Sequence, residues 1–198
     1  MGLDIPDLGA RDRGFLGRIR GQLSPHDAPF RFPDRARAAA VVAILHRRQG
    51  RWSIPFVVRR PDLRSHPGQV GLPGGGIEAG EDAWSAAVRE AEEEISAPRQ
   101  GLTPLGSTGT VRVTRFNFAV VTFVAHLAYD DWPFVFDPGE LTGVLEVDLK
   151  DLLNRRLWKV DRTSILGRHF PASPYPIWGL TARLLEELLP RLEAAVEA

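Results

Sequence analysis

The sequence predicts an α/β fold in which a mixed β-sheet lies between helices. Apolar, β-branched segments of strand length flank a long Ala- and Glu-rich segment, and amphipathic segments with helical periodicity stand near both ends of the chain. The chain has 198 residues, of which 43% are hydrophobic, and this size suits one domain with peripheral additions.

The N-terminal part predicts a helix and a linker. Residues 11–23 place four apolar side chains on one helical face, namely Phe15, Leu16, Ile19 and Leu23. Arginines occupy the remaining positions, so a helix on a membrane surface is an alternative to a helix docked on the domain, which we favour. Prolines then mark a linker, and we divide the chain into residues 1–34, the helix and linker, and residues 35–198, the main domain.

The first half of the main domain predicts two strands, a long loop and a helix. Residues 38–46 and 54–59 have the apolar, β-branched character of paired buried strands. Residues 61–76 are irregular, and a loop of this length in a compact domain is usually functional. The helix begins near Glu81 and ends before Pro98, because proline disfavours helix at the residue preceding it.

The second half predicts further strands and a final helix. Strands are expected at residues 103–113, 117–127 and 142–148, with an acidic loop at 130–140 and a short helix at Leu149–Leu153. Residues 154–176 predict irregular or hairpin structure. The chain closes with an amphipathic helix that has Leu184, Leu188 and Leu192 in phase, and Pro190 is expected to kink it.

Composition excludes several classes of function. Lys+Arg and Asp+Glu both number 25, so no overall basic field points to nucleic acid as a partner. Cysteine is absent, which removes disulfides, thiolate metal sites and cysteine nucleophiles. The sequence shows neither a signal peptide nor a membrane-spanning apolar run, and we expect a cytoplasmic protein that does not bind membranes. No pattern fixes an oligomeric state.

A crowded acidic patch is the main functional signal. At about 100° per residue, Glu93 and Glu94 fall on either side of Glu90, one helical turn further along. Like charges at this spacing destabilise an isolated helix. A divalent cation such as Mg²⁺, which prefers oxygen ligands, is the simplest compensation.

The spacing around this patch resembles the Nudix box. Gly75, Glu81 and the run Arg89-Glu90-Ala91-Glu92-Glu93-Glu94 stand in the register of that motif. The resemblance implies a Nudix-type α/β/α sandwich and a Nudix hydrolase domain over residues 35–198. Ser96 and Ala97 depart from the glycine and bulky aliphatic residue that normally close the box, which leaves the exit of the helix open.

A second motif lies upstream. Arg59, Arg64 and Gly68 precede Pro73-Gly74-Gly75, and this order resembles the signature of the coenzyme A pyrophosphatase branch of the Nudix family. Leu72 replaces an aromatic residue, and Arg60 replaces a small one. Arginine forks and glycine backbone N–H groups suit phosphate oxygens. We therefore expect a substrate-binding set of Arg59, Arg64, Gly68, Gly74 and Gly75.

The Nudix resemblance also implies the roles in the catalytic set, which is Arg89, Glu90, Glu93 and Glu94. Glu90 and Glu94 are expected to bind Mg²⁺ or Mn²⁺, with Glu93 as a further ligand or a partner of one. Arg89 is expected to orient a box glutamate, and Glu81 to tie the glycine loop to the helix. The general base is left open between a box glutamate and the outside candidates Glu140 and Glu146.

The predicted function is metal-dependent hydrolysis of a small nucleotide, coenzyme A, to 3′,5′-ADP and 4′-phosphopantetheine. One alternative is a Nudix pyrophosphatase for another nucleoside diphosphate derivative, such as ADP-ribose or NADH. The other is a nucleotide-binding module without catalysis.

Overall fold

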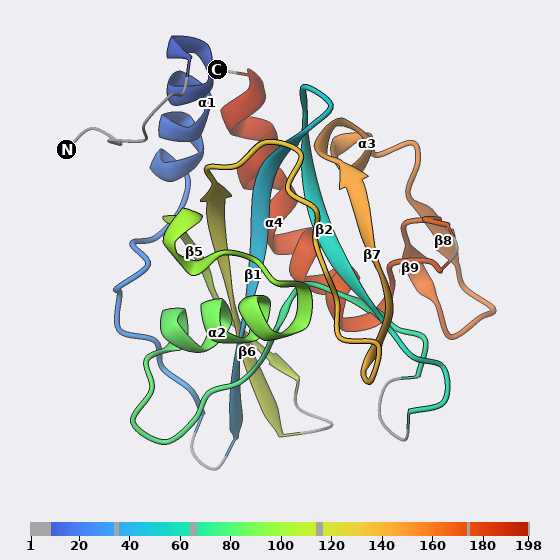
Figure 1. The fold of residues 1–198 in the computed structure, drawn as a ribbon. Helices are drawn as coiled ribbons and strands as arrows, with labels where there is room; N and C mark the ends of the chain where they lie inside the picture. Colours follow the sequence, from blue (N-terminus) through green and yellow to red (C-terminus); the bar gives the residue numbers. More distant parts are fainter. Residues whose placement is uncertain (1–8, 34–35, 64–66, 114–116, 174, 198) are drawn as a thin grey trace.

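The computed structural model describes residues 9–33, 36–63, 67–113, 117–173 and 175–197. They form three layers, with a mixed β-sheet between helices (Figure 1). Helix α2 (Ala83–Ile95) covers one face of the sheet, and α1 (Ala10–Gly21) and α4 (Gly179–Glu197) cover the other. The predicted α/β/α arrangement with a mixed sheet is confirmed.

In the described ranges seven strands form the sheet: β1 (Arg37–Arg48), β2 (Arg51–Arg59), β3 (Val70–Gly71), β4 (Gly74–Gly76), β5 (Leu102–Val113), β6 (Phe118–Leu127) and β7 (Leu141–Asp148). On one side, β1 pairs in parallel with β6, and β6 pairs antiparallel with β5. On its other side, β1 pairs antiparallel with two strands, with β4 near its start and with β2 near its end. Strand β2 in turn pairs with β3 and β7. The parallel pair among antiparallel neighbours makes the sheet mixed.

Helix α2 approaches the sheet closely because its inner face is built from small side chains. Ala86, Ala87 and Ala91 are fully buried and share one core cluster with Val42 of β1 and Phe123 of β6. The polar side of the same helix carries the box glutamates, of which Glu93 is exposed and Glu94 is buried.

Helices α1 and α4 pack together on the opposite face. Leu16 and Ile19 of α1 are fully buried in one cluster with Leu188 of α4. Arg18 Nε donates to the Ala195 carbonyl oxygen at 2.8 Å. The N-terminal helix is therefore docked on the domain, as favoured from the sequence. The division at residue 34 stays a prediction.

The remaining elements follow the sequence expectation closely. Helix α3 spans Leu149–Leu153, and residues 154–176 contain a hairpin of β8 (Lys159–Asp161) and β9 (Gly167–His169). The loop expected at 61–76 contains the short strands β3 and β4. Helix α4 continues through Pro190 to Glu197. None of the helices in the described ranges is long and apolar enough to cross a membrane.

Candidate active site

Helix α2 begins and ends at residues that fix its position beside the glycine segment. The Asp82 side chain accepts hydrogen bonds from the Ser85 backbone N–H at 2.9 Å and from its hydroxyl at 2.6 Å, which caps the N-terminus. Ser96 ends the helix in the left-handed conformation, with a φ of 53°. Ala97 is fully buried. The two departures from the box are thus accommodated. Ser96 adopts the backbone conformation that usually favours glycine, and Ala97 fills an apolar site.

Glu94 is the buried carboxylate of the cluster. Its side chain is only 8% exposed, and one carboxylate oxygen accepts a hydrogen bond from the Gly74 N–H at 3.0 Å. Burial raises the pKa of Glu94 to about 7, although the Gly74 hydrogen bond opposes this shift; the charge of Glu90 raises the pKa further and that of Arg59 lowers it. A buried carboxylate with this pKa is stabilised in its charged form by a cation.

Arg89 holds the acidic residues around it in place. Its guanidinium donates to Glu81 at 3.1 and 3.2 Å, to Glu90 at 2.8 Å and to Glu93 at 3.2 Å. It also donates to the Gly76 carbonyl oxygen at 3.2 Å, while Glu81 accepts from the Glu78 N–H at 3.2 Å. Arg89 and Glu81 therefore tie the glycine segment to the helix, as the resemblance implies.

Gly75 provides the space that the Glu90 carboxylate occupies. A Cβ atom at Gly75 would collide with the carboxylate carbon and both oxygens of Glu90. Gly74 has a φ of 147° and lies directly against the backbone of Ala40 and Val41. Strand β4 therefore needs glycine at both positions, and its pairing with β1 places it beside the acidic face of α2.

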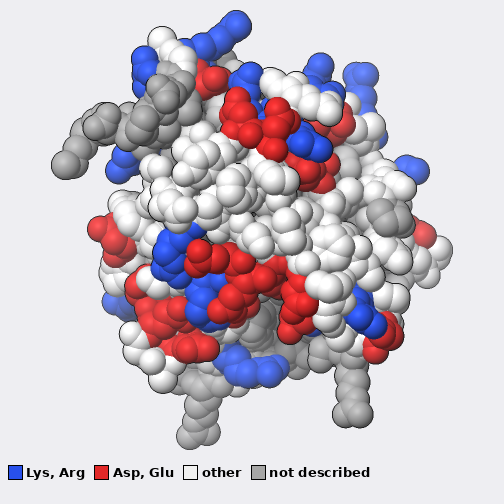
Figure 2. Space-filling model, viewed as in Figure 1, with Lys and Arg blue, Asp and Glu red and all other residues white. Residues whose placement is uncertain are grey.

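The predicted metal ligands gather beside Arg89 and the glycine segment. Glu93 is 61% exposed on its side chain, and both Glu90 and Glu93 pair with Arg89. Within the described ranges, no group of three His, Asp or Glu side chains has the geometry to hold a metal. The donor set fits a hard cation nevertheless, because it is all oxygen and contains the buried carboxylate of Glu94. Figure 2 shows acidic side chains gathered over α2, with basic side chains among them, beside a recess.

The upstream motif places one positively charged side chain, that of Arg59, at the edge of the acidic cluster. Arg59 is the last residue of β2, and its buried Nε atom has no hydrogen-bond partner among the residues that the structure describes. Its charge lowers the pKa of Glu94, so the two side chains lie within electrostatic range of each other. Gly68 has a φ of 65°, and its N–H donates to the Arg60 carbonyl oxygen at 3.3 Å. Arg64 lies outside the described residues.

The acidic loop before β7, which ends in the outside candidate Glu140, also lies at the edge of the acidic cluster. Arg60 Nη1 donates to the Pro138 carbonyl oxygen at 2.8 Å, and the Arg60 N–H donates to the Glu140 carbonyl oxygen at 3.0 Å. The charge of Glu140 raises the pKa of Glu94. The acidic composition of the loop was a signal, but its place depends on the pairing of β7 with β2, where Leu141 stands opposite Arg59.

Glu146 occupies a different position. A carboxylate oxygen lies 3.0 Å from Nε2 of the buried His46, although the pair is not aligned as a hydrogen bond, and the other oxygen lies 3.5 Å from Arg48. Glu146 stands opposite Pro55 on β2, so it is roughly 16 Å along β7 from Leu141 at about 3.3 Å per residue. Of the two outside candidates, only Glu140 is near the acidic cluster.

The fold and the site define a Nudix protein, and the comparisons agree. The model of the NUDIX domain matches residues 36–166, and the chain belongs to the Nudix hydrolase family. It is 31% identical over 173 residues to the uncharacterized Nudix hydrolase NudL of Salmonella paratyphi B, covering 73% of this chain and 82% of that protein. The family hydrolyses nucleoside diphosphate derivatives with divalent metal ions.

Solved structures share the fold at low sequence identity. The Caenorhabditis elegans Ap4A hydrolase in a binary complex has a TM-score of 0.52 and 16% identity, covering 82% of this chain and 96% of that one. The NUDIX domain of Shewanella oneidensis NrtR complexed with ADP ribose has a TM-score of 0.53 and 16% identity, covering 81% and 90%. At these identities the likeness shows the fold alone.

Proposed function

We propose that this Nudix hydrolase cleaves the diphosphate of coenzyme A, giving 3′,5′-ADP and 4′-phosphopantetheine. The observation that carries the proposal is Arg59, a guanidinium with an unpartnered buried Nε at the edge of the acidic cluster. An arginine held in this way offers a planar donor group to a phosphate oxygen. Its position in the coenzyme A-type motif, ahead of Gly68 and the glycines of β4, supports the same substrate.

In the proposed site Glu90 and Glu94 bind Mg²⁺ or Mn²⁺. Glu93 either binds the ion directly or holds one of its ligands in place. The ion, when bound, polarises the phosphoryl group and lowers the pKa of a bound water. Arg89 donates hydrogen bonds to both Glu90 and Glu81 and so keeps the Glu90 carboxylate in place. The missing side chain of Gly75 leaves the space that this carboxylate occupies. Glu93 is the most exposed of the three, with 61% of its side chain accessible.

The hydrolysis itself adds one water across the P–O–P bridge. The water oxygen forms a bond to one phosphorus, the bridging P–O bond breaks, and the leaving phosphate departs with the bond electrons. Glu140 is the proposed proton acceptor for this water, supported by its charge acting on Glu94 and by its place next to Leu141, which pairs with Arg59. Glu146 is set aside because His46 and Arg48 engage it elsewhere on the sheet.

A substrate panel tests the proposal. Wild-type protein is assayed with coenzyme A, ADP-ribose and NADH at equal concentration in Mg²⁺, and coenzyme A is expected to have the highest kcat/KM. The variant Arg59→Ala is expected to lower kcat/KM for coenzyme A by roughly 30-fold or more, the effect of losing a charge-assisted hydrogen bond. A preference for ADP-ribose or NADH overturns the coenzyme A assignment, and no turnover of any of them favours the non-catalytic alternative.

Arg64 is proposed as a second phosphate-binding residue. The variant Arg64→Ala is expected to weaken use of coenzyme A more than use of ADP-ribose, with Arg51→Ala, an exposed arginine at the other end of β2, as the control. An equal loss on all diphosphates in Arg64→Ala makes it a general phosphate ligand rather than a determinant of specificity.

A further inference from the structure

The loop before β7 ends in a tight turn over residues 137–140, which we call the 137–140 turn. The Asp137 carbonyl oxygen accepts hydrogen bonds from the Glu140 N–H at 3.2 Å and from the Leu141 N–H at 2.9 Å. The Asp137 side chain accepts another from the Gly139 N–H at 2.8 Å. These bonds make the turn a single unit, so a contact that holds any part of its backbone also restrains Glu140.

The Arg60 side chain fastens this turn to the end of β2. Arg60 Nη1 donates to the Pro138 carbonyl oxygen at 2.8 Å, and the proline ring, which fixes φ, stiffens the turn at that residue. Arg60 Nε and Nη2 donate to the two carboxylate oxygens of Asp62 at 2.9 and 2.6 Å, and this fork fixes the plane of the guanidinium. All three nitrogen atoms of Arg60 therefore donate within the chain, which suits a structural contact and not the binding of a phosphate.

A β-bulge shapes the same segment, where the start of β7 lies beside the end of β2 (Figure 1). Val58 stands opposite Gly143, but the next residue, Arg59, stands opposite Leu141. Thr142 is therefore the extra residue of the bulge, and its hydroxyl donates to the Val58 carbonyl oxygen at 3.3 Å. An extra residue of this kind bends its strand and redirects the side chains beside it. The bulge thus acts on the segment that the guanidinium holds, at the point where β7 begins.

Glu140 depends on this support because it is exposed on a turn and not built into a strand. The Arg60 N–H donates to the Glu140 carbonyl oxygen at 3.0 Å, and the charge of Glu140 raises the pKa of Glu94. A general base must lie within about 2.6–3.2 Å of the water that it deprotonates. A displacement of about 1 Å can lower the rate on the order of a hundredfold. The position of the turn is therefore as important as the carboxylate that it carries.

We infer that Arg60 is the positioning residue of Glu140. By holding the Pro138 carbonyl oxygen, its side chain fixes the 137–140 turn and keeps the Glu140 carboxylate at the edge of the acidic cluster. The inference rests on the proposed role of Glu140 as the proton acceptor. Arg60 acts through Glu140 and is not itself a catalytic residue. It departs from the small residue of the coenzyme A-type motif, and the contact with the turn gives this departure a function.

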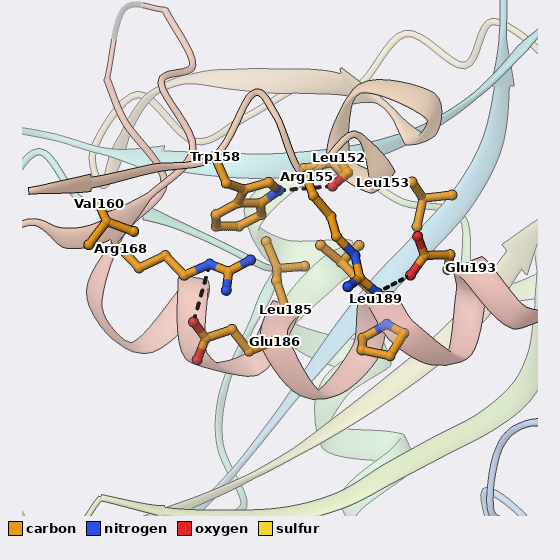
Figure 3. Close-up of a pocket in the computed structure, with 11 residues that line it drawn as sticks. Leu152, Leu153, Arg155, Trp158, Val160, Arg168, Leu185, Glu186, Leu189 and Glu193 are labelled. Carbon is orange, nitrogen blue, oxygen red and sulfur yellow. Dashed lines mark hydrogen bonds and ion pairs between the residues drawn. The ribbon is translucent and has the colours of Figure 1, made fainter.

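Arg168 provides a matched control. It lies in a hollow of about 630 Å³ between α3, the β8–β9 hairpin and α4, on the face of the sheet opposite α2 (Figure 3). Its guanidinium pairs with Glu186 at 3.4 Å and so joins the hairpin to α4, as Arg60 joins the turn to β2. The side chains of Arg60 and Arg168 are similarly exposed, at 38% and 46%. Arg168→Ala therefore removes a comparable contact away from the acidic site.

Amide hydrogen exchange tests the anchoring independently of any activity. The Glu140 and Leu141 N–H groups close the 137–140 turn. In Arg60→Ala their exchange is expected to become about tenfold faster or more, because the turn opens more often. In Arg168→Ala their exchange is expected to stay as in the wild type. Unchanged exchange in Arg60→Ala, or the same increase in both variants, overturns the inference.

Steady-state kinetics test whether the anchored turn serves catalysis, with the diphosphate substrate that the wild type hydrolyses fastest. Arg60→Ala is expected to lower kcat by about tenfold and to leave KM within about twofold, because a displaced base slows the reaction more than it weakens binding. Glu140→Gln is expected to lower kcat by about a hundredfold or more. The double variant is expected to lose no more than Glu140→Gln alone, because Arg60 acts only through Glu140.

The outcomes separate the inference from the proposed function. A further loss of kcat in the double variant, or an effect of Arg60→Ala on KM alone, shows that Arg60 acts elsewhere and overturns the inference. Wild-type kcat in Glu140→Gln, together with faster exchange in Arg60→Ala, overturns the proposed base and leaves Arg60 as the anchor of the turn.

Discussion

Ser96 ends α2 in a backbone conformation that glycine adopts more easily than serine. Its φ is 53°, and its N–H donates to the Glu92 carbonyl oxygen at 3.0 Å. A side chain in the left-handed region costs about 1 kcal/mol. We therefore expect Ser96→Gly to raise the free energy of unfolding by about that amount, measured by urea denaturation. Ser96→Ala is the control, because it keeps the Cβ atom; an equal gain in both variants contradicts the explanation.

Glu94 makes the stability of the metal-free protein depend on pH. Its pKa is raised from 4.5 to about 7, so between these values the folded protein holds a proton that the unfolded chain has released. Stability should then fall as the pH rises through this window, by on the order of 3 kcal/mol, and level off above it.

Melting temperatures in chelator at pH 5 and pH 8 measure this effect. The wild type is expected to lose more stability than Glu94→Gln between the two pH values, because glutamine does not titrate. Mg²⁺ is expected to stabilise the wild type more at pH 8 than at pH 5. The same pH dependence in both proteins would show that another group is responsible.

At the scale of elements, strand β4 and helix α2 form the acidic site together. Gly75→Ala places a Cβ atom on the Glu90 carboxylate, so we expect the fold to be kept and metal affinity to fall by about tenfold or more. Gly76→Ala is a close control, because a Cβ atom there meets nothing within 4 Å and φ is not in the left-handed region. Titration with Mn²⁺ measures both variants. Equal affinities would contradict the close contact between Gly75 and Glu90.

The elements themselves could largely be predicted from the sequence. Helix α2 lies within the expected range because Asp82 caps it and Pro98 follows it, and α3 has the expected bounds. The contact of Arg89 with a box glutamate was expected from the resemblance to the Nudix box, whereas its contact with Glu81 was not predicted. Local patterns determine the bounds of these helices.

Features that depend on pairing between distant segments of the chain could not be predicted from local sequence patterns. The parallel register of β1 with β6 joins segments about eighty residues apart, such as Ala40 and Val121. Glu140 reaches the acidic site through the pairing of β7 with β2 and could not be separated from Glu146 by sequence alone. The left-handed Ser96 was likewise hidden, because serine gives no signal for that conformation.

At the scale of the whole molecule, α1 is part of the core. Leu16 and Ile19 have no exposed surface. Leu16→Ala is therefore expected to lower the free energy of unfolding by about 2–4 kcal/mol, in a single transition for the whole protein. Gly17→Ala, on the open side of the same helix, is expected to stabilise by roughly 0.5–1 kcal/mol. A separate early transition in Leu16→Ala would instead show that the N-terminal segment unfolds as an independent unit.

The two walls of the acidic site come from separate parts of the chain. One wall is the continuous segment from Gly74 to Glu94, and the other joins the end of β2 to the start of β7. Mutations in one wall need not disturb the other, so in evolution the reaction can be conserved while the preferred substrate changes. A directed-evolution library restricted to residues 59–69 and 137–141, with Glu140 kept unchanged, would explore new diphosphate substrates on an unchanged metal centre.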